Sequence, residues 1–361
     1  TGAFTQVAGT GTTTLASMIG VASLSATTAN IAVSGGTQLN STGEITLTST
    51  SNTLVFSGTS ELKANEGDGN INITGNVTGD ANDNAEVTFN GTTTIDGNII
   101  GTAGSGIEQL NIEGGNLSVG SLNIAGSVTS DSGSDVEATG NEGIAIGGMA
   151  TLGGNLSTTF ATADIGIVVS VSLTDSMTFS TSDGMVNIMG AGGIDGNVGV
   201  DLKFDIIATV TGAIGPSLQN LIVTNGKLTA DSINITGNMT IDAGSEVEAS
   251  GNNGIEIAGS ATIAGSVTSA GNVTISDGVT LTRDATVYHD IIHTADQFII
   301  TGNLGVDTVP GGMPGDPRVN LFTNGVFDIS GAVGSNLDLL EIQTGSLQAG
   351  TVDLTGDLVA L

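Results

Sequence analysis

The feature that most constrains the fold of this chain is a long internal repeat built from very short apolar segments. Residues 101–112 (GTAGSGIEQLNI) return without a gap as residues 212–223 (GAIGPSLQNLIV) and again as residues 331–342 (GAVGSNLDLLEI). Self-similarity over roughly 110 residues is typical of a repetitive array, in which each repeat builds the same local structure. The chain is therefore expected to fold as a series of similar units.

Within a unit the apolar residues form triplets of an apolar, a polar and an apolar residue, the alternation of a strand with one buried face. In the second unit the triplets begin at Leu110, Leu117, Leu122, Val128, Val136, Ile144, Ala150 and Leu156. Strands this short, joined by a few Gly, Asn, Asp or Ser residues, cannot form a stable free-standing meander. If three of them coil into a rung of about 18 to 22 residues, each strand pairs in parallel with the next rung at ~4.8 Å.

The sequence thus predicts an all-β fold, an elongated parallel β-helix or β-solenoid of short strands. Tandem β-sandwich modules are the alternative, because the length of the repeat also suits an immunoglobulin-like domain. The chain has no Trp, a single Tyr and no Pro-rich linker between units, which favours the solenoid. One longer alternating run, residues 165–174, predicts a wider sheet or a lateral excursion.

The repeat divides the chain into four parts. Residues 1–100 form a first unit, 101–211 a second, 212–330 a third and 331–361 a partial fourth. The third unit is expected to carry a lateral insertion at residues 283–318. The partial fourth unit is expected to be an assembly end, because an uncapped stack of strands exposes edges that pair with other chains.

The net charge of the chain limits the classes of molecule that it is expected to bind. Thirty-six Asp and Glu stand against five Lys and Arg, a formal net charge of −31. Nucleic acids and anionic membrane surfaces are bound through clustered basic residues, and the five in this chain lie far apart, so no nucleic-acid partner is expected. No apolar run approaches the length of a transmembrane helix, so no membrane span is expected. The absence of Cys excludes disulfides, thiolate metal sites and cysteine nucleophiles.

Acidic residues recur in the repeat with a spacing that suits hard cations. Calcium takes six to eight oxygen ligands, and carboxylates two residues apart can converge on it together with backbone carbonyls. The candidate Ca²⁺ ligands are Asp131, Asp135 and Glu137 in the second unit, their equivalents Asp242, Glu246 and Glu248 in the third, and Asp80, Asn82, Asn84 and Glu86 in a further oxygen-rich loop. The alternative is that these are outward-facing turn residues that keep a strand-rich surface soluble.

One stretch differs in composition from the rest of the chain. Residues 283–318 hold both His, the only Tyr, both Arg and three of the four Pro. A loop rich in Pro and Gly cannot continue a strand ladder, so it is expected to project and to contact another subunit or a receptor, with a plain surface loop as the alternative. The candidate contact residues are Tyr288, His289, His293, Pro310, Pro314, Pro317 and Arg318. The two His have a metalloprotease spacing but lack the helix that this motif needs, so no catalytic metal is expected.

Together with the repeated pattern GxxGSxLxxLxIxxGxLxxxxxNIxG, these features resemble a known class of protein. The chain is similar to passenger regions of large repetitive bacterial surface proteins, the rickettsial outer-membrane-protein-B type of autotransporter and related S-layer or adhesin arrays. The resemblance extends over nearly the whole chain. It implies export, an extracellular location at the bacterial cell surface, and a coat or adhesive role.

Three functions are open on the sequence alone. The first is a structural protein, a homo-oligomer that associates head to tail or laterally into a filament or surface layer, without catalysis. The second is an adhesin that binds a host or surface ligand. The third is a carbohydrate-active β-helix enzyme, which the low aromatic content and the scarcity of basic residues oppose.

Overall fold

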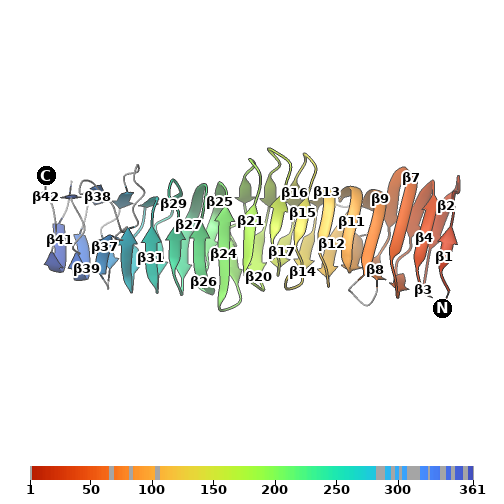
Figure 1. Ribbon diagram of the computed structural model, residues 1–361, viewed down its shortest axis with the longest axis horizontal. Coiled ribbons are helices and arrows are strands. Elements are labelled where there is room, and N and C mark those ends of the chain that lie inside the picture. The colour runs from red at the N-terminus through yellow and green to blue at the C-terminus, as the bar shows by residue number, and fades with distance from the viewer. Residues whose placement is uncertain are drawn as a thin grey trace, which may run out of the picture. The chain divides into compact units, whose positions relative to one another are not determined.

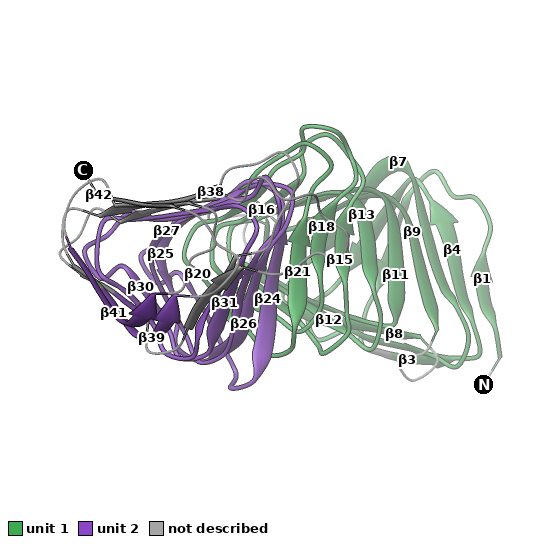
Figure 2. Cartoon of the chain, turned by 60° about the vertical axis from the view of Figure 1, so that its left-hand side comes forward, with its two compact units in different colours: residues 1–187 green, residues 188–361 purple. Residues whose placement is uncertain are grey.

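The computed structural model describes residues 2–64, 69–80, 84–101, 106–281, 289–293, 297–300, 303–306, 318–323, 326–333, 339–342, 346–352 and 357–360. Every regular element in these residues is a β-strand (Figure 1). The chain forms two compact units, unit 1 with residues 1–187 and unit 2 with residues 188–361, coloured separately in Figure 2. Each unit is a solenoid of parallel strands, which confirms the predicted fold class and excludes the sandwich alternative.

In unit 1 three short strands, or the parts of a bent strand, make one rung, and each pairs in parallel with the next rung. The first sheet contains β1 (Phe4–Gln6), β4 (Leu24–Thr28), the first parts of β7 (Ile45–Phe56), β9 (Asn70–Gly79), β11 (Thr92–Ile100) and β13 (Leu117–Ile124), then β15 (Val136–Ala138), β18 (Leu156–Thr158) and β21 (Met177–Ser180). The second contains β2 (Thr12–Leu15), β5 (Asn30–Val33), the second parts of the same four long strands, β16 (Ile144–Ile146) and β19 (Ile165–Ile167). The third contains β3 (Met18–Val21), β6 (Gln38–Ser41), β8 (Thr59–Ala64), β10 (Asn84–Asn90), β12 (Gly106–Glu113), β14 (Ser127–Ser130), β17 (Met149–Leu152) and β20 (Ser170–Leu173).

Unit 2 follows the same plan, and β22 (Val186–Ile188) spans the boundary in the sequence. One sheet contains β24 (Val200–Asp205), β26 (Leu218–Val223), β28 (Met239–Ile241), β31 (Ser260–Ile263), β34 (Gly278–Leu281) and β37 (Asn303–Val306). A second contains the first parts of β25 (Ala208–Ile214) and β27 (Lys227–Ile235), then β29 (Glu246–Ala249), β32 (Ser266–Ser269), β35 (His289–His293), β38 (Arg318–Thr323), β40 (Leu339–Ile342) and β42 (Asp357–Ala360). A third contains β23 (Ile194–Gly196), the second parts of β25 and β27, then β30 (Ile255–Ile257), β33 (Val273–Ile275), β36 (Gln297–Ile300) and the first parts of β39 (Val326–Val333) and β41 (Ser346–Val352). The second parts of β39 and β41 continue the sheet of β37.

The core of each unit consists of stacked apolar rows. In the first sheet of unit 1, Leu24 pairs with Ile45 and Ile45 pairs with Ile71, and their exposed fractions are 2%, 0% and 0%. Each is one apolar member of a triplet, so the alternation in the sequence places it inward. Full burial of such a side chain contributes about 1.5–3 kcal/mol. The rows therefore account for the stacking of rungs whose strands are too short to be stable alone.

The rung length agrees only in part with the predicted 18 to 22 residues, since some rungs are longer and Glu86 lies 27 positions from Thr59 in the preceding rung. Hydrogen bonds between neighbouring rungs join residues that are 18 positions apart at Asn220 and Asn238, and 23 positions apart at Asn155 and Thr178. The prediction for residues 165–174 was wrong. They form the two short ladder strands β19 and β20 instead of a wider sheet or a lateral excursion, because Val168 and Val169 lie at the corner between them and are each 47% exposed.

The stretch from 283 to 318 contains three ladder strands as well as residues outside the described part. Strands β35, β36 and β37 pair in parallel with β32, β33 and β34 of the preceding rung. Residues 282–288 and 307–317 lie outside the described residues. The segment expected to form a lateral insertion thus supplies a full rung of the solenoid.

Candidate functional site

The outer surface of the third sheet of unit 1 carries rows of polar side chains, here called the polar face. Its strands are β6, β8, β10, β12 and β14, and its rows are set by the parallel register. One row contains Gln38, Glu61, Thr88, Asn111 and Thr129, and the next contains Asn40, Lys63, Asn90 and Glu113. Successive members of a row lie ~4.8 Å apart, close enough for side chains on neighbouring rungs to interact.

Carboxylates on the polar face accept hydrogen bonds from amides and hydroxyls of adjacent rungs. Glu86 accepts one from Thr59 Oγ1 at 3.2 Å and another from Asn111 Nδ2 at 3.3 Å. Asn111 Nδ2 also lies 3.2 Å from Thr88 Oγ1. These bonds join β8, β10 and β12 through their side chains in addition to their backbones. Hydrogen bonds to a charged group are among the stronger ones, about 1.5–3 kcal/mol each when shielded from water and less at a surface.

Glu113 is the carboxyl on this face whose pKa is perturbed. Partial burial is the largest cause that raises its pKa, and the neighbouring charges of Asp131 and Glu61 raise it further. The positive charge of Lys63 and a hydrogen bond from Asn90 Nδ2 at 3.1 Å act in the opposite direction. The balance leaves Glu113 readier to take up a proton than a carboxyl in water.

The loop predicted to bind calcium at residues 80–86 is placed only in part. Asn82 lies outside the described residues, while Asn84 and Glu86 belong to β10. Asp80 follows β9, and its Oδ2 lies 3.5 Å from Ser57 Oγ. The Glu86 carboxylate is turned to Thr59 and Asn111 through the hydrogen bonds described above.

The acids of the second repeat unit have separate partners. Asp131 continues the row of Glu113 at the end of β14 and acts on the pKa of that residue. Asp135 instead accepts a hydrogen bond from the backbone N–H of Asn155 at 2.7 Å, one rung on. Glu137 lies in the middle of β15 and is half-buried. The triplet of acids seen in the sequence is therefore divided between a loop and a strand.

The equivalent acids of the third repeat unit surround a lysine. Lys227 Nζ lies 3.0 Å from Glu246 Oε1 and 2.6 Å from Glu248 Oε2, all on the outer side of β27 and β29. Asp242 lies in the preceding turn, where its carbonyl accepts the N–H of Ser245. The pKa of Lys227 is raised, first by its hydrogen bond to Glu248 and then by that to Glu246. The lysine ammonium is thus the cation between these two carboxylates.

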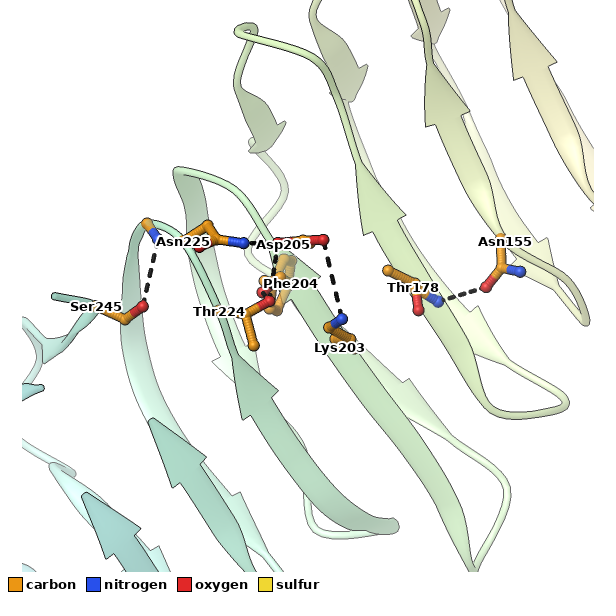
Figure 3. A network of polar contacts seen from close by, with 9 residues as sticks. Asn155, Thr178, Lys203, Phe204, Asp205, Thr224, Asn225 and Ser245 are labelled. Carbon is orange, nitrogen blue, oxygen red and sulfur yellow. Dashed lines mark hydrogen bonds and ion pairs between the residues drawn. The ribbon is translucent and has the colours of Figure 1, made fainter. Parts of the chain in front are cut away.

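A further polar network in unit 2 was not predicted from the sequence (Figure 3). Asp205 Oδ1 accepts hydrogen bonds from Asn225 Nδ2 at 2.6 Å and from Thr224 Oγ1 at 2.9 Å, while Lys203 Nζ lies 3.9 Å from Oδ2. The bond from Asn225 is the largest cause that lowers the pKa of Asp205. Asn225 has a φ of 57°, a conformation that Asn adopts more readily than most residues, so this corner needs Asn or Gly. The Asn-Gly dipeptide at this position was the available signal.

The predicted contact residues lie mostly beyond the described part of the chain. Tyr288, Pro310, Pro314 and Pro317 are outside it. His289 and His293 are the first and last residues of β35, and Arg318 begins β38. Both strands belong to the ladder, paired in parallel with each other.

Among the described residues, no group of three or more His, Asp or Glu side chains is placed to hold one metal ion. That part of the chain also contains no helix long and apolar enough to span a membrane. Comparisons with protein-family models, curated proteins and solved structures gave no match.

Proposed function

We propose that this chain is an extracellular structural protein of the bacterial cell surface that self-assembles into a filament or surface layer and performs no catalysis. The observation that carries the proposal is the set of polar ladders that join successive rungs through side chains. Such ladders occur in both units, and they hold neighbouring rungs together.

The ladder in unit 1 runs along one corner of the solenoid. Asn116 Oδ1 accepts the backbone N–H of Asp135 at 3.0 Å, and Asp135 Oδ1 accepts that of Asn155 at 2.7 Å. Asn155 Oδ1 then accepts the N–H of Thr178 at 2.7 Å (Figure 3). Asn116 and Asp135 thus satisfy the amides that directly precede β15 and β18, and Asn155 satisfies the amide of Thr178 within β21. These bonds join successive rungs in addition to the backbone ladder.

Unit 2 has an equivalent ladder. Asn220 Oδ1 accepts the N–H of Asn238 at 2.9 Å, and Asn238 Oδ1 accepts both the N–H of Ser260 at 2.9 Å and its hydroxyl at 3.0 Å. A stack tied at core, strands and corners resists bending and local opening, since separating two rungs breaks all three kinds of contact. This property suits a load-bearing scaffold, and the high acidic charge suits a surface exposed to water.

Assembly is tested with the purified full chain. Sedimentation velocity and negative-stain electron microscopy are run over a concentration series, with calcium and with a chelator. We expect species larger than the monomer and regular filaments or sheets, and stronger association as the pH falls toward the sequence pI of about 4.1, because self-repulsion then declines. A single monomeric species at every concentration and pH, with calcium and with the chelator, would refute the proposal.

An adhesin is the second candidate, and the polar face favours it. Rows of amide, hydroxyl and carboxylate groups at ~4.8 Å offer repeated donors and acceptors to a polar polymer. Binding of the purified chain to immobilised polysaccharides or host-cell surfaces is measured for the wild type and for Gln109→Lys, an exposed position on the polar face. Thr94→Lys, exposed on the first sheet, is the matched control. Adhesion through the polar face is supported only if the first variant alone loses binding.

A further inference from the structure

The only basic residue in the sequence of unit 1 stands in one row with an amide and a carboxyl. Lys63 on β8 pairs with Asn90 on β10, and Asn90 pairs with Glu113 on β12. Each follows a fully buried residue in its strand, namely Leu62, Phe89 and Ile112, so all three side chains leave the sheet on its outer side. Parallel register holds the three Cα atoms in sequence at ~4.8 Å per step.

The amide in the middle of this row is in contact with the carboxyl. Asn90 Nδ2 donates a hydrogen bond to Glu113 Oε2 at 3.1 Å. Lys63 is close enough for its charge to act on the pKa of Glu113, which burial and two neighbouring acids nevertheless raise. An amine, a carboxamide and a carboxyl able to exchange protons are therefore arranged on three consecutive rungs.

We propose that Lys63 and Asn90 form an intramolecular isopeptide bond and that Glu113 is the acid–base group for its formation. The Lys63 ammonium gives a proton to Glu113, and the free Nζ lone pair attacks Asn90 Cγ. The Nζ–Cγ bond forms, the Cγ–Nδ2 bond breaks, and Glu113 returns the first proton to Nδ2, which leaves as ammonia. The second Nζ proton passes to this ammonia, which becomes an ammonium ion. An ammonium and a carboxamide become an amide and an ammonium ion, so the step balances without an oxidant, a reductant or a cofactor.

The fold supplies what this reaction lacks in water. Aminolysis of an amide is slow between free molecules, but groups held in a near-attack arrangement reach effective molarities on the order of 10⁵–10⁸ M. A carboxyl positioned to move the proton adds about 10²–10⁴-fold. Since the side chains rise from neighbouring strands of one sheet, the lysine needs only rotamer changes to reach the amide. The product ties β8 to β10 covalently.

The other two lysines of the chain serve as controls, because the residue beside each in the next rung is not an amide. Lys203 pairs with Ile222, and Lys227 pairs with Glu246. Neither row offers a carboxamide to attack, so neither lysine forms such a bond. The proposal thus predicts modification at one lysine of three.

Intact-mass spectrometry of the denatured full chain is the test. We expect the wild type to weigh one ammonia less than its sequence, a peptide joined through Lys63 and Asn90 after digestion, and no tryptic cleavage after Lys63. Lys63→Arg retains the charge but should restore the full sequence mass. Glu113→Gln should slow the loss of ammonia by about 10²–10⁴-fold in a time course after purification. Lys203→Arg and Lys227→Arg should still lose ammonia, and far-UV circular dichroism verifies that every variant is folded.

Two other reactions give the same change in mass. Lys63 also pairs with Asn40 of the preceding rung, and a bond between them would appear as a joined peptide that contains Asn40 instead of Asn90, which would overturn the proposal. The second reaction is separated by the variants. Asn90 precedes Gly91, and attack by the Gly91 nitrogen on the Asn90 side chain would form a succinimide with loss of ammonia. That loss would persist in Lys63→Arg, would leave no joined peptide and would overturn the proposal. A wild-type chain of unmodified mass would overturn it equally. An unchanged rate in Glu113→Gln would overturn the role of that carboxyl.

Discussion

The pair of buried aromatic rings in unit 1 gives a sharp test of how the solenoid is held together. Phe89 from β10 and Phe56 from β7 are both 0% exposed, and their rings meet edge to face with centroids 6.4 Å apart and planes at 86°. They come from different sheets, so their contact fixes two walls of the solenoid to each other. Phe89→Ala removes this contact and leaves a cavity in a narrow core.

The expected cost can be worked from burial. Truncation of a buried Phe to Ala costs about 3–5 kcal/mol, which includes the lost transfer free energy and the cavity. The edge-to-face contact with Phe56 accounts for about 0.5–1.5 kcal/mol of that sum. With a urea m-value of about 2 kcal/mol/M, a cost of about 4 kcal/mol lowers the midpoint of unfolding by about 2 M.

The assay is urea unfolding of the full chain followed by far-UV circular dichroism, with the m-value checked because solenoids can unfold in parts. Phe160→Ala is the matched control, since Phe160 is 45% exposed and its loss should change stability by less than ~0.5 kcal/mol. A double-mutant cycle with Phe56→Leu and Phe89→Leu isolates the ring contact. A cost below about 1 kcal/mol for Phe89→Ala, at an unchanged m-value, would refute the reasoning.

Three further predictions concern polar contacts and a close backbone approach. Lys227→Met leaves Glu246 and Glu248 without their shared ammonium and should destabilise unit 2 by up to ~1 kcal/mol at low salt and by less at high salt. Because the pKa of Lys227 is raised, the stability that this lysine contributes is complete below the ordinary pKa of 10.5 and is lost as the pH rises through the raised pKa. Urea midpoints measured against pH for the wild type and the variant check this. Because the pKa of Asp205 is lowered, the stability that its carboxylate contributes is present above the ordinary pKa of 3.8 and is lost as the pH falls through the lowered pKa. Asp205→Asn should therefore make the free energy of unfolding fall less steeply with decreasing pH in the acid range. An unchanged slope in the variant would contradict this. Gly126→Ala places a Cβ 1.7 Å from the Glu108 carbonyl oxygen and should cost about 1–3 kcal/mol by thermal unfolding, in contrast to a near-neutral Gly20→Ala, whose Cβ meets nothing within 4 Å.

The apolar triplets predicted the core because a period of two has one physical meaning in a strand. Residues such as Val136 and Ala138 are buried on both sides of the half-buried Glu137, as the alternation requires. The corners, where the chain turns from one sheet to the next, were harder to predict from the sequence. Strand β7 runs through a corner without Gly or Pro, where Asn52 adopts a φ of 62° and the register shifts between Thr48 and Thr53. No Gly or Pro marks this bend, so the position of the corner was not predicted from the sequence.

The polar sites were less predictable because their partners are set by rung length. Lys227 and Glu246 are 19 positions apart, and Asp205 and Asn225 are 20 apart. A rung one residue longer would turn these side chains to opposite faces, since strand side chains alternate. The sequence showed the acids and their repetition, but their neighbours follow only from the register of the stacked strands.

Comparison of the two repeat copies shows where the chemistry of this solenoid can vary. Asn116 and Lys227 occupy equivalent places, each directly before the leucine that begins the next buried triplet. Asn116 binds the backbone N–H of Asp135, whereas Lys227 binds the carboxylate of Glu246, the counterpart of Asp135. The same backbone register therefore carries a neutral corner cap in one copy and an ion pair in the other. Because the inward rows fix the fold and the outward rows do not, one scaffold can present different polar surfaces along its length.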